Sequence, residues 1–228
     1  MRSTWNTAGS RSDCSTWNDR TEPARRVLQA GLDSLSATAS PSQVDSLFEL
    51  ACLLERWSGR MNLTGHRSLE AIVERLILDA AALSQALPEF GSLADLGSGA
   101  GLPGLPIAIL RPRCHVTLVD SRERRHHFQR AAVREIGIAN AEPLRGRVED
   151  LEPRPHAAVI AQALARPERA LAWMVRWAEP GGFLFLPGGK KPHRVPECPE
   201  IEFETCLRYR TPGRTFERTV WVGRRRSA

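Results

Sequence analysis

The chain has 228 residues and a mass of 25.3 kDa, and 42% of its residues are hydrophobic and 25% charged. These values are typical of a globular protein with a sizeable core, and they exclude whole-chain disorder and a fibrous protein. The formal net charge of +6 and the isoelectric point near 9.6 favour a polyanionic partner such as nucleic acid. No apolar run approaches the ~18 residues of a membrane span, so we expect no membrane association.

The cysteines give no sign of a metal site or a disulfide framework. There are five, at positions 14, 52, 114, 198 and 206, with no Cys-x-x-Cys pair, and the chain contains no His-Glu-x-x-His motif. Scattered cysteines in odd number are typical of reduced thiols. The first twenty residues also lack the apolar core of a secretory signal. We therefore expect a cytoplasmic protein without a bound metal.

The N-terminal part of the chain is predicted to be helical after a disordered tail. Residues 1–22 are rich in Ser and Thr and show no hydrophobic periodicity, which is typical of disorder. Apolar residues then recur at helical spacing in three stretches, 24–36, 41–57 and 69–87. We assign these stretches to an N-terminal helical region over residues 23–88.

From about residue 91, short apolar runs alternate with helical patterns. Strands are predicted at 92–96, 115–119, 142–145, 157–161 and 183–186, and helices from the glycines after residue 96 to 110 and at 121–136 and 167–177. Alternation of this kind favours right-handed βαβ units and a parallel sheet.

The C-terminal segment has a different pattern. Two strand-like runs, 201–210 and 215–222, flank the turn sequence Thr211-Pro212-Gly213-Arg214, which predicts an antiparallel hairpin. The sequence thus predicts an α/β domain over residues 89–228, with a mostly parallel sheet that ends in an antiparallel pair.

The glycine-rich segment after the first predicted strand is the strongest indication of a binding site. It reads Asp-Leu-Gly-Ser-Gly-Ala-Gly-Leu-Pro-Gly over residues 95–104, and glycines between a strand and a helix let the backbone approach a ligand closely. Two cofactor classes share this geometry. The spacing Gly99-x-Gly101-x-x-Gly104 also matches the dinucleotide-binding pattern, and an acid, Asp120, lies 19 residues beyond Gly101.

Two acids at predicted strand ends favour S-adenosylmethionine over a dinucleotide. Asp95 stands two residues before Gly97, where a carboxylate suits the ammonium and sulfonium charges of S-adenosylmethionine and repels a pyrophosphate. Asp120 follows the second strand and can accept hydrogen bonds from the ribose hydroxyls of either cofactor. An NAD-dependent oxidoreductase is therefore the weaker hypothesis.

Several short motifs occur in a recognisable order. They are Met61-Asn62-Leu63-Thr64, Ile77-Leu78-Asp79, the segment 95–108, Val119-Asp120-Ser121 and Arg147-Val148-Glu149. The set resembles the RsmG (GidB) family of class I methyltransferases, which methylate guanine N7 in small-subunit (16S) rRNA. The resemblance runs from about residue 47 to 189, and Gly-Leu-Pro-Gly-Leu-Pro over 101–106 is its most specific element. It implies a Rossmann-like, seven-stranded α/β fold, S-adenosylmethionine as cofactor, and 16S rRNA or the small ribosomal subunit as partner.

The resemblance also implies roles for residues near the predicted strand ends. Gly97 and Leu102 would line the S-adenosylmethionine pocket, Asp120 would hold the ribose, and Val148 and Glu149 would lie beside the adenine. The complete set of expected cofactor-binding residues is Asp95, Gly97, Gly99, Gly101, Leu102, Asp120, Val148, Glu149 and Gln162. The residues expected to be catalytic are basic: Arg124, Arg125 and Arg147.

The sequence departs from the family pattern on the side where the substrate is expected. The Ser-Arg-Ala after the fourth strand reads Ala161-Gln162-Ala163, and the Lys-Gly after the fifth reads Pro187-Gly188, with Lys190 nearby. Around Ile-Leu-Asp, the family's His and Ser are Leu76 and Ala80. These changes leave a second hypothesis open, a catalytically impaired S-adenosylmethionine-binding protein that interacts with RNA.

The expected chemistry needs no general base, because guanine N7 attacks with a lone pair and carries no proton. Orientation of the reactants can supply about 7–11 kcal/mol of the barrier reduction.

Two groups of basic residues could contact RNA phosphates. One is a stripe at i, i+4, i+8 and i+12 of a predicted helix, namely Arg122, His126, Arg130 and Arg134. The other lies in the C-terminal segment: Arg208, Arg210, Arg214, Arg218, Arg224, Arg225 and Arg226. We expect a monomer.

Overall fold

The computed structural model describes residues 18–61, 63–195 and 197–227. Residues 1–17, which make up most of the predicted tail, lie outside this range. Within it, no helix combines the length and apolar character needed to cross a membrane. The described residues also contain no cluster of three or more His, Cys, Asp or Glu side chains able to hold a metal ion.

The first N-terminal helix begins earlier than the sequence predicts, and the second ends later. Helix α1 spans Asn18–Ser34, so the expectation of disorder is wrong for residues 18–22. The helix is stable there because its buried stripe, formed by Ala24, Leu28 and Leu32, packs into the core and orders the turn before it. Helix α2 follows over Pro41–Met61 and extends four residues beyond the predicted end.

A single helical rod precedes the sheet and contains a π-helical turn. It consists of α3 (Leu69–Ile72), the π-helical turn η2 (Val73–Ile77) and α4 (Leu78–Ala86). The hydroxyl of Ser68 accepts a hydrogen bond from the N–H of Ala71 and caps the first turn. The predicted helix over 69–87 is confirmed.

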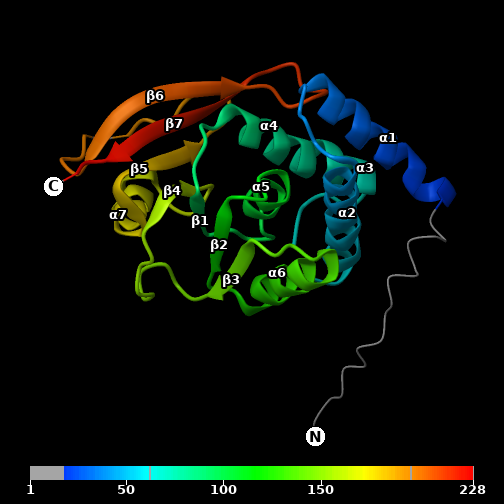
Figure 1. Cartoon of the computed structure of the whole chain (residues 1–228), viewed down its shortest axis with the longest axis horizontal. Coiled ribbons are helices and arrows are strands. Elements are labelled where there is room, and N and C mark those ends of the chain that lie inside the picture. The colour runs from blue at the N-terminus through cyan, green and yellow to red at the C-terminus, as the bar shows by residue number, and fades with distance from the viewer. Residues whose placement is uncertain (1–17, 62, 196, 228) are drawn as a thin grey trace, which may run out of the picture.

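The sheet has seven strands in the order β3-β2-β1-β4-β5-β7-β6 (Figure 1). They are β1 (Ser92–Leu96), β2 (His115–Asp120), β3 (Ala141–Arg145), β4 (His156–Ala161), β5 (Ala178–Pro187), β6 (Ile201–Tyr209) and β7 (Arg218–Arg225). Strands β1 to β5 are parallel, and β7 runs antiparallel to both β5 and β6. The predicted mixed sheet with a C-terminal antiparallel pair is confirmed.

Helices cover both faces of the sheet (Figure 1). Helices α5 (Gly104–Leu110) and α6 (Glu123–Ile136) lie with the N-terminal helices on one face, and α7 (Pro167–Trp177) lies on the other. Side chains of β1 alternate between the two layers, because successive residues of a strand point to opposite faces. Leu93 accordingly packs in the first core, whereas Ala94 and Leu96 pack in the second.

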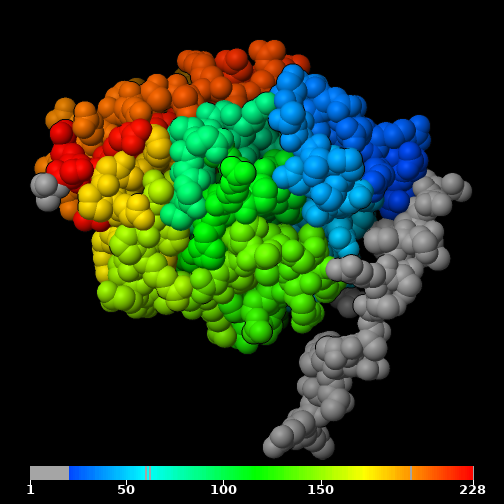
Figure 2. Space-filling view, in the orientation of Figure 1, coloured from blue at the N-terminus to red at the C-terminus, as the bar shows by residue number. Residues whose placement is uncertain are grey.

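The N-terminal helices share the first core with the sheet domain. Trp57 of α2 meets Phe128 of α6 edge to face, with ring centroids 5.6 Å apart. Helix α4 contacts both α5 and β6. The blue and teal surface of these helices is continuous with the green surface of α5 and α6 and with the orange hairpin in Figure 2. Their positions are therefore fixed relative to the sheet.

Candidate functional site

The predicted glycine loop lies where β1 ends, at the carboxyl edge of the sheet, which we define as the edge at which β1 to β5 finish. The N–H groups of Gly97 and Ser98 both donate to the carbonyl of Val119 in β2, at 2.8 and 3.0 Å. The backbone adopts left-handed conformations at three predicted site glycines, with φ of 73° at Gly97, 58° at Gly99 and 74° at Gly101. These angles explain the glycine at every second position.

Glycine is also required by close packing under the loop. A Cβ atom at Gly101 would lie 2.4 Å from a methyl carbon of Leu105. A Cβ atom at Gly104 would lie 2.3 Å from a methyl carbon of Leu118 and 2.8 Å from Oδ2 of Asp95. Helix α5 can therefore begin directly against β1 and β2 only because residue 104 has no side chain.

Asp95 lies beneath the loop and binds its backbone. The residue is 1% exposed, and its Oδ2 accepts a hydrogen bond from the N–H of Gly104 at 2.9 Å. Burial raises the pKa of Asp95 to about 7, while the Gly104 bond opposes the shift and the nearby Asp120 adds to it. Asp95 therefore fastens the end of the loop to the start of α5.

Asp120 joins three parts of the site. Its Oδ2 accepts hydrogen bonds from the N–H of Gly99 at 3.0 Å and from Nη1 of Arg125 at 3.3 Å. Its Oδ1 accepts the N–H of Arg122 at 2.8 Å. The carboxylate thus connects the glycine loop, the end of β2 and the first turn of α6, and the structure brings together the predicted residues Gly99, Asp120 and Arg125.

Sequence reasoning missed Gln129, which supports the loop from α6. The residue is fully buried, and its Nε2 donates to Oγ of Ser98 and to the carbonyl of Gly99, both at 2.8 Å. Its Oε1 is buried and accepts no hydrogen bond among the described residues. The signal in the sequence was a polar residue directly after Phe128 on the core-facing side of a helix.

The predicted residues after β3 form the neighbouring part of the carboxyl edge. Val148 is buried in the second core. Glu149 lies between two arginines, with an oxygen 3.5 Å from Nε of Arg147 and 3.7 Å from Nη2 of Arg169. The pKa of Glu149 is lowered, first by a hydrogen bond from its own backbone and then by these arginines. Arg147 is mostly exposed, and no described contact joins it to Asp120.

The ends of β4 and β5 complete the edge. Gln162 is half-buried, and the nearby Leu164 packs over Gly97, so the segment after β4 adjoins the loop. Pro187 is buried at the end of β5, where the N–H of the following residue, Gly188, donates to the carbonyl of Thr219 at 2.7 Å. Lys190 is exposed, with its Nζ 4.8 Å from the ring centroid of Phe216.

The predicted basic stripe of α6 is exposed at its three arginines, Arg122, Arg130 and Arg134. His126 is half-buried, and burial, followed by the charge of Arg130, lowers its pKa. Arg124, one of the expected catalytic residues, is exposed on the same helix and forms no ion pair with any described residue.

A buried ion pair connects α4 to the C-terminal hairpin. Asp79 accepts a hydrogen bond from Oγ1 of Thr211 at 2.6 Å and is paired with Arg218. Nε of Arg218 donates to the carbonyl of Gly188 at 3.2 Å. Burial lowers the pKa of the Arg218 guanidinium, but the charge and hydrogen bond of Asp79, together with Tyr209, outweigh burial and raise it. The expectation that Arg218 contacts phosphate is therefore wrong, because its charge is neutralised inside the protein.

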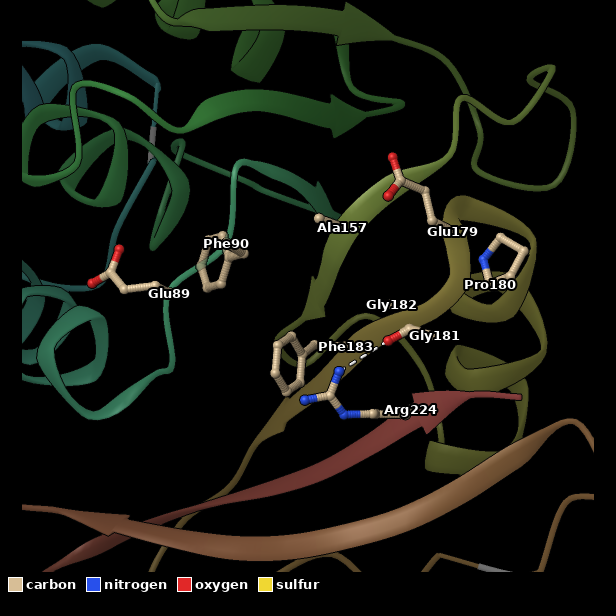
Figure 3. A pocket seen from close by; sticks show the side chains of 9 residues that line it. All are labelled: Glu89, Phe90, Ala157, Glu179, Pro180, Gly181, Gly182, Phe183 and Arg224. Atoms are coloured by element: carbon tan, nitrogen blue, oxygen red, sulfur yellow. Dashed lines mark hydrogen bonds between the residues drawn. The ribbon is translucent and has the colours of Figure 1, made fainter. Parts of the chain in front are cut away.

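The hollow shown in Figure 3 lies at the opposite edge of the sheet. It has a volume of about 190 Å³ and is lined by Phe90 before β1, Ala157 of β4 and residues 179–183 of β5. Arg224 reaches across it and donates to the carbonyl of Gly181 at 3.1 Å, as Figure 3 shows. Because parallel strands begin at this edge, it contains none of the residues predicted to bind the cofactor or to be catalytic.

Strand order, the glycine loop after β1 and the acid at the end of β2 together define the class I methyltransferase fold. Two solved structures resemble the chain in fold. M. jannaschii TYW2 in complex with AdoMet matches with a TM-score of 0.51 at 14% identity, over 66% of this chain and 76% of that one. A SAM-dependent methyltransferase from Aquifex aeolicus matches with a TM-score of 0.50 at 16% identity, over 67% and 92%.

Sequence comparisons identify the family. A family model described as rRNA small subunit methyltransferase G matches residues 43–209. The ribosomal RNA small subunit methyltransferase G of Stenotrophomonas maltophilia (strain R551-3) is 40% identical over 72% of this chain and 73% of its own length. The protein of the same name from Serratia proteamaculans (strain 568) is 34% identical over 86% and 98%. The chain belongs to the rRNA small subunit methyltransferase G family.

Proposed function

We propose that the protein transfers the methyl group of S-adenosylmethionine to N7 of a guanine in 16S rRNA. The observation that carries this proposal is the intact glycine loop, held against Asp120 in a member of this family. We further propose that it acts in the cytoplasm and as a monomer.

The hydrogen bonding of the loop favours S-adenosylmethionine over a dinucleotide. Between Gly97 and Leu105 the chain has eight N–H groups, and seven of them donate to protein acceptors. The donors are those of Gly97, Ser98, Gly99, Gly101, Leu102, Gly104 and Leu105. A pyrophosphate needs free N–H groups at a helix start, whereas S-adenosylmethionine has no phosphate. The NAD-dependent alternative is therefore not supported.

The residues present fit S-adenosylmethionine. Asp120 would accept hydrogen bonds from the ribose hydroxyls in the place now taken by Arg125, and Gly97 and Leu102 would line the pocket. Val148 and Glu149 would lie beside the adenine at the end of β3, where burial of Val148 provides an apolar wall. When bound, the cofactor supplies an electrophilic methyl group on a sulfonium.

Besides binding the cofactor, the protein must orient the guanine and exclude water from the reaction site. No proton leaves N7, so none of the three proposed catalytic arginines is needed as a base. Arg125, released from Asp120 by the ribose, would line the edge of the cofactor pocket, and the exposed Arg124 and Arg147 would contact RNA phosphates at the rim. Gln162, at the end of β4, has an amide that can both donate and accept, as the edge of guanine requires.

A direct assay tests the proposal. Purified protein and radiolabelled S-adenosylmethionine are incubated with small subunits, or with their naked RNA, from cells that lack the modification. We expect label in 7-methylguanine of 16S rRNA. Absence of label from both substrates, with the cofactor still bound, would instead support the catalytically impaired RNA-interaction protein suggested by Gln162 and Pro187.

A further inference from the structure

The structure divides the arginine-rich C-terminal segment into residues with internal partners and residues without. Arg224 pairs with Glu204 at 2.9 Å and also donates to a backbone carbonyl, and Arg225 donates to the carbonyl of Ala178 at 2.6 Å. Arg208 and Arg210 both lie within 4 Å of Glu217. Together with the half-buried Arg218, five of the seven predicted arginines already have acidic or carbonyl partners.

Arg214 differs from these five. It lies in the turn between β6 and β7, and no described acid lies within ion-pair distance of it. Its Nε is buried and makes no hydrogen bond among the described residues. Its guanidinium carbon lies 5.3 Å from the ring centroid of Phe216.

A second cation, Lys190, also lies against the ring of Phe216. Nζ of Lys190, from the loop after β5, lies 4.8 Å from the same ring centroid, so the two positive centres are at most about 10 Å apart. An aromatic ring attracts cations through its quadrupole and reduces their freedom. Lys191 and Arg194, exposed in the same loop, have no ion-pair partner among the described residues and add to the positive charge.

This pair of cations lies at the carboxyl edge of the sheet, the edge that also carries the glycine loop. β6 runs parallel to β5 because both are antiparallel to β7, so the β6–β7 turn and the loop after β5 leave the sheet at the same edge. The hydrogen bond from Gly188 to Thr219 confirms that they adjoin. Only β4 separates β5 from β1, which places the end of β5 roughly 10 Å from the glycine loop.

We propose that Lys190 and Arg214, held on Phe216, form a clamp that binds phosphates of the single-stranded RNA segment carrying the target guanine. The proposal rests on the proposed function, because it assumes that RNA approaches the carboxyl edge. Two cations without internal partners, close together beside a cofactor site, match the charge of an RNA backbone. The clamp also places a lysine near the position where Pro187 replaces the family's lysine.

The test compares two double variants with the same change of charge. Lys190→Gln/Arg214→Gln removes the clamp. Arg113→Gln/Arg176→Gln removes two exposed arginines that precede β2 and β5, at the opposite edge of the sheet. Binding of an unmodified 16S rRNA transcript is measured over a range of salt concentrations, and methyl transfer to the same RNA gives KM and kcat.

We expect the clamp variant to bind RNA several-fold more weakly and its salt slope, the change of log affinity with log salt, to decrease by about 1.4. Its KM for RNA rises several-fold, and its affinity for S-adenosylhomocysteine does not change. The control variant keeps the wild-type slope. Phe216→Leu keeps both charges but removes the aromatic ring that holds Lys190 and Arg214 in place. We expect its KM for RNA to rise as well, but less than that of the clamp variant.

An unchanged slope in the clamp variant, or an equal decrease in both double variants, would overturn the proposal. The proposed function is judged separately, on the wild-type protein. A wild type that methylates RNA while the clamp variant keeps its KM contradicts the clamp alone. A wild type that binds RNA through the clamp but transfers no methyl group contradicts the proposed function alone.

Discussion

The two halves of the carboxyl edge are built differently. On the cofactor side, which comprises the glycine loop with Asp95, Asp120 and Gln129, almost every polar group has an internal partner and the acids are buried. On the substrate side, which comprises the ends of β4 and β5 and the β6–β7 turn, the polar groups are largely exposed cations. A buried network fixes one small molecule in one geometry, whereas exposed cations suit a large, flexible polyanion.

The departures from the family pattern follow the same division. The cofactor side keeps the glycines and both acids, each of which has a packing or hydrogen-bonding role that no other residue fills. Gln162, one of the residues expected to bind the cofactor, and Pro187 lie at the ends of β4 and β5, which belong to the substrate side. There a charge can be supplied from a neighbouring position, such as Lys190, without changing the core.

The largest expected effect concerns the ion pair of Asp79 with Arg218, which joins α4 to the C-terminal hairpin. Asp79→Ala leaves the guanidinium of Arg218 buried without its carboxylate, which should lower the free energy of unfolding by about 3–5 kcal/mol. Urea unfolding followed by circular dichroism measures the change. Glu135→Ala breaks the exposed pair with Arg56 and should cost less than about 1 kcal/mol. Equal losses would mean that the hairpin is not anchored through Asp79.

Among the site variants, Asp120→Ala should lower the affinity for the cofactor most. It removes the acceptor for Gly99, Arg122 and Arg125 and the proposed acceptor for the ribose. Loss of two charge-assisted hydrogen bonds to the ribose corresponds to an affinity for S-adenosylhomocysteine that is lower by roughly 100-fold. Calorimetry measures it, and Glu123→Ala, an exposed acid on the first turn of α6, is the control. An affinity within a few-fold of wild type would exclude Asp120 from the cofactor site.

Gln129→Leu and a variant of its neighbour separate cofactor binding from RNA binding within the single helix α6. The variant removes both hydrogen bonds to the loop, and we expect affinity for S-adenosylhomocysteine to fall roughly tenfold, because buried loop groups are left unpaired. The adjacent Arg130→Gln changes an exposed residue and should weaken only RNA binding. If both variants lowered the affinity for S-adenosylhomocysteine equally, Gln129 would have no special role in shaping the loop.

A further expected effect is a pH dependence of stability. The pKa of Asp95 is raised to about 7 by burial, so the folded protein binds a proton that the unfolded chain releases near pH 4. The resulting stabilisation is complete below pH 4 and is lost as the pH rises towards 7, by at most about 1.4 kcal/mol per pH unit. Unfolding of the wild type and of Asp95→Asn between pH 4 and 8 measures it. The wild type should lose stability relative to the variant as the pH rises, and parallel curves would contradict the assignment.

Much of the fold was predictable because its signals are local. Hydrophobic periodicity placed most strands within one or two residues, and the glycine spacing identified the loop. Strands β5 and β7 are the exceptions: β5 begins at Ala178, five residues before its predicted start, and β7 spans Arg218–Arg225, three residues later than predicted at each end. In the structure, Ala178 pairs with His156 of β4 across an irregular register, which extends β5 back to Ala178.

The side-chain networks could not be predicted, because their partners lie far apart in the chain. Asp79 and Arg218 are 139 residues apart, and nothing near Arg218 distinguishes it from the exposed arginines around it. Gln129 and Ser98 meet only because α6 packs beside the glycine loop. The clamp at Phe216 likewise joins two loops that adjoin only through the pairing of β5 with β7.

Calorimetric titration of the wild-type protein with S-adenosylhomocysteine, with NAD as the control, tests the central claim most directly. We expect one site per chain for S-adenosylhomocysteine and no heat of binding for NAD, because the loop amides are occupied and Asp120 faces Gly99. Binding of NAD, or of neither compound, would contradict the claim that the cofactor side of this protein is an intact S-adenosylmethionine site.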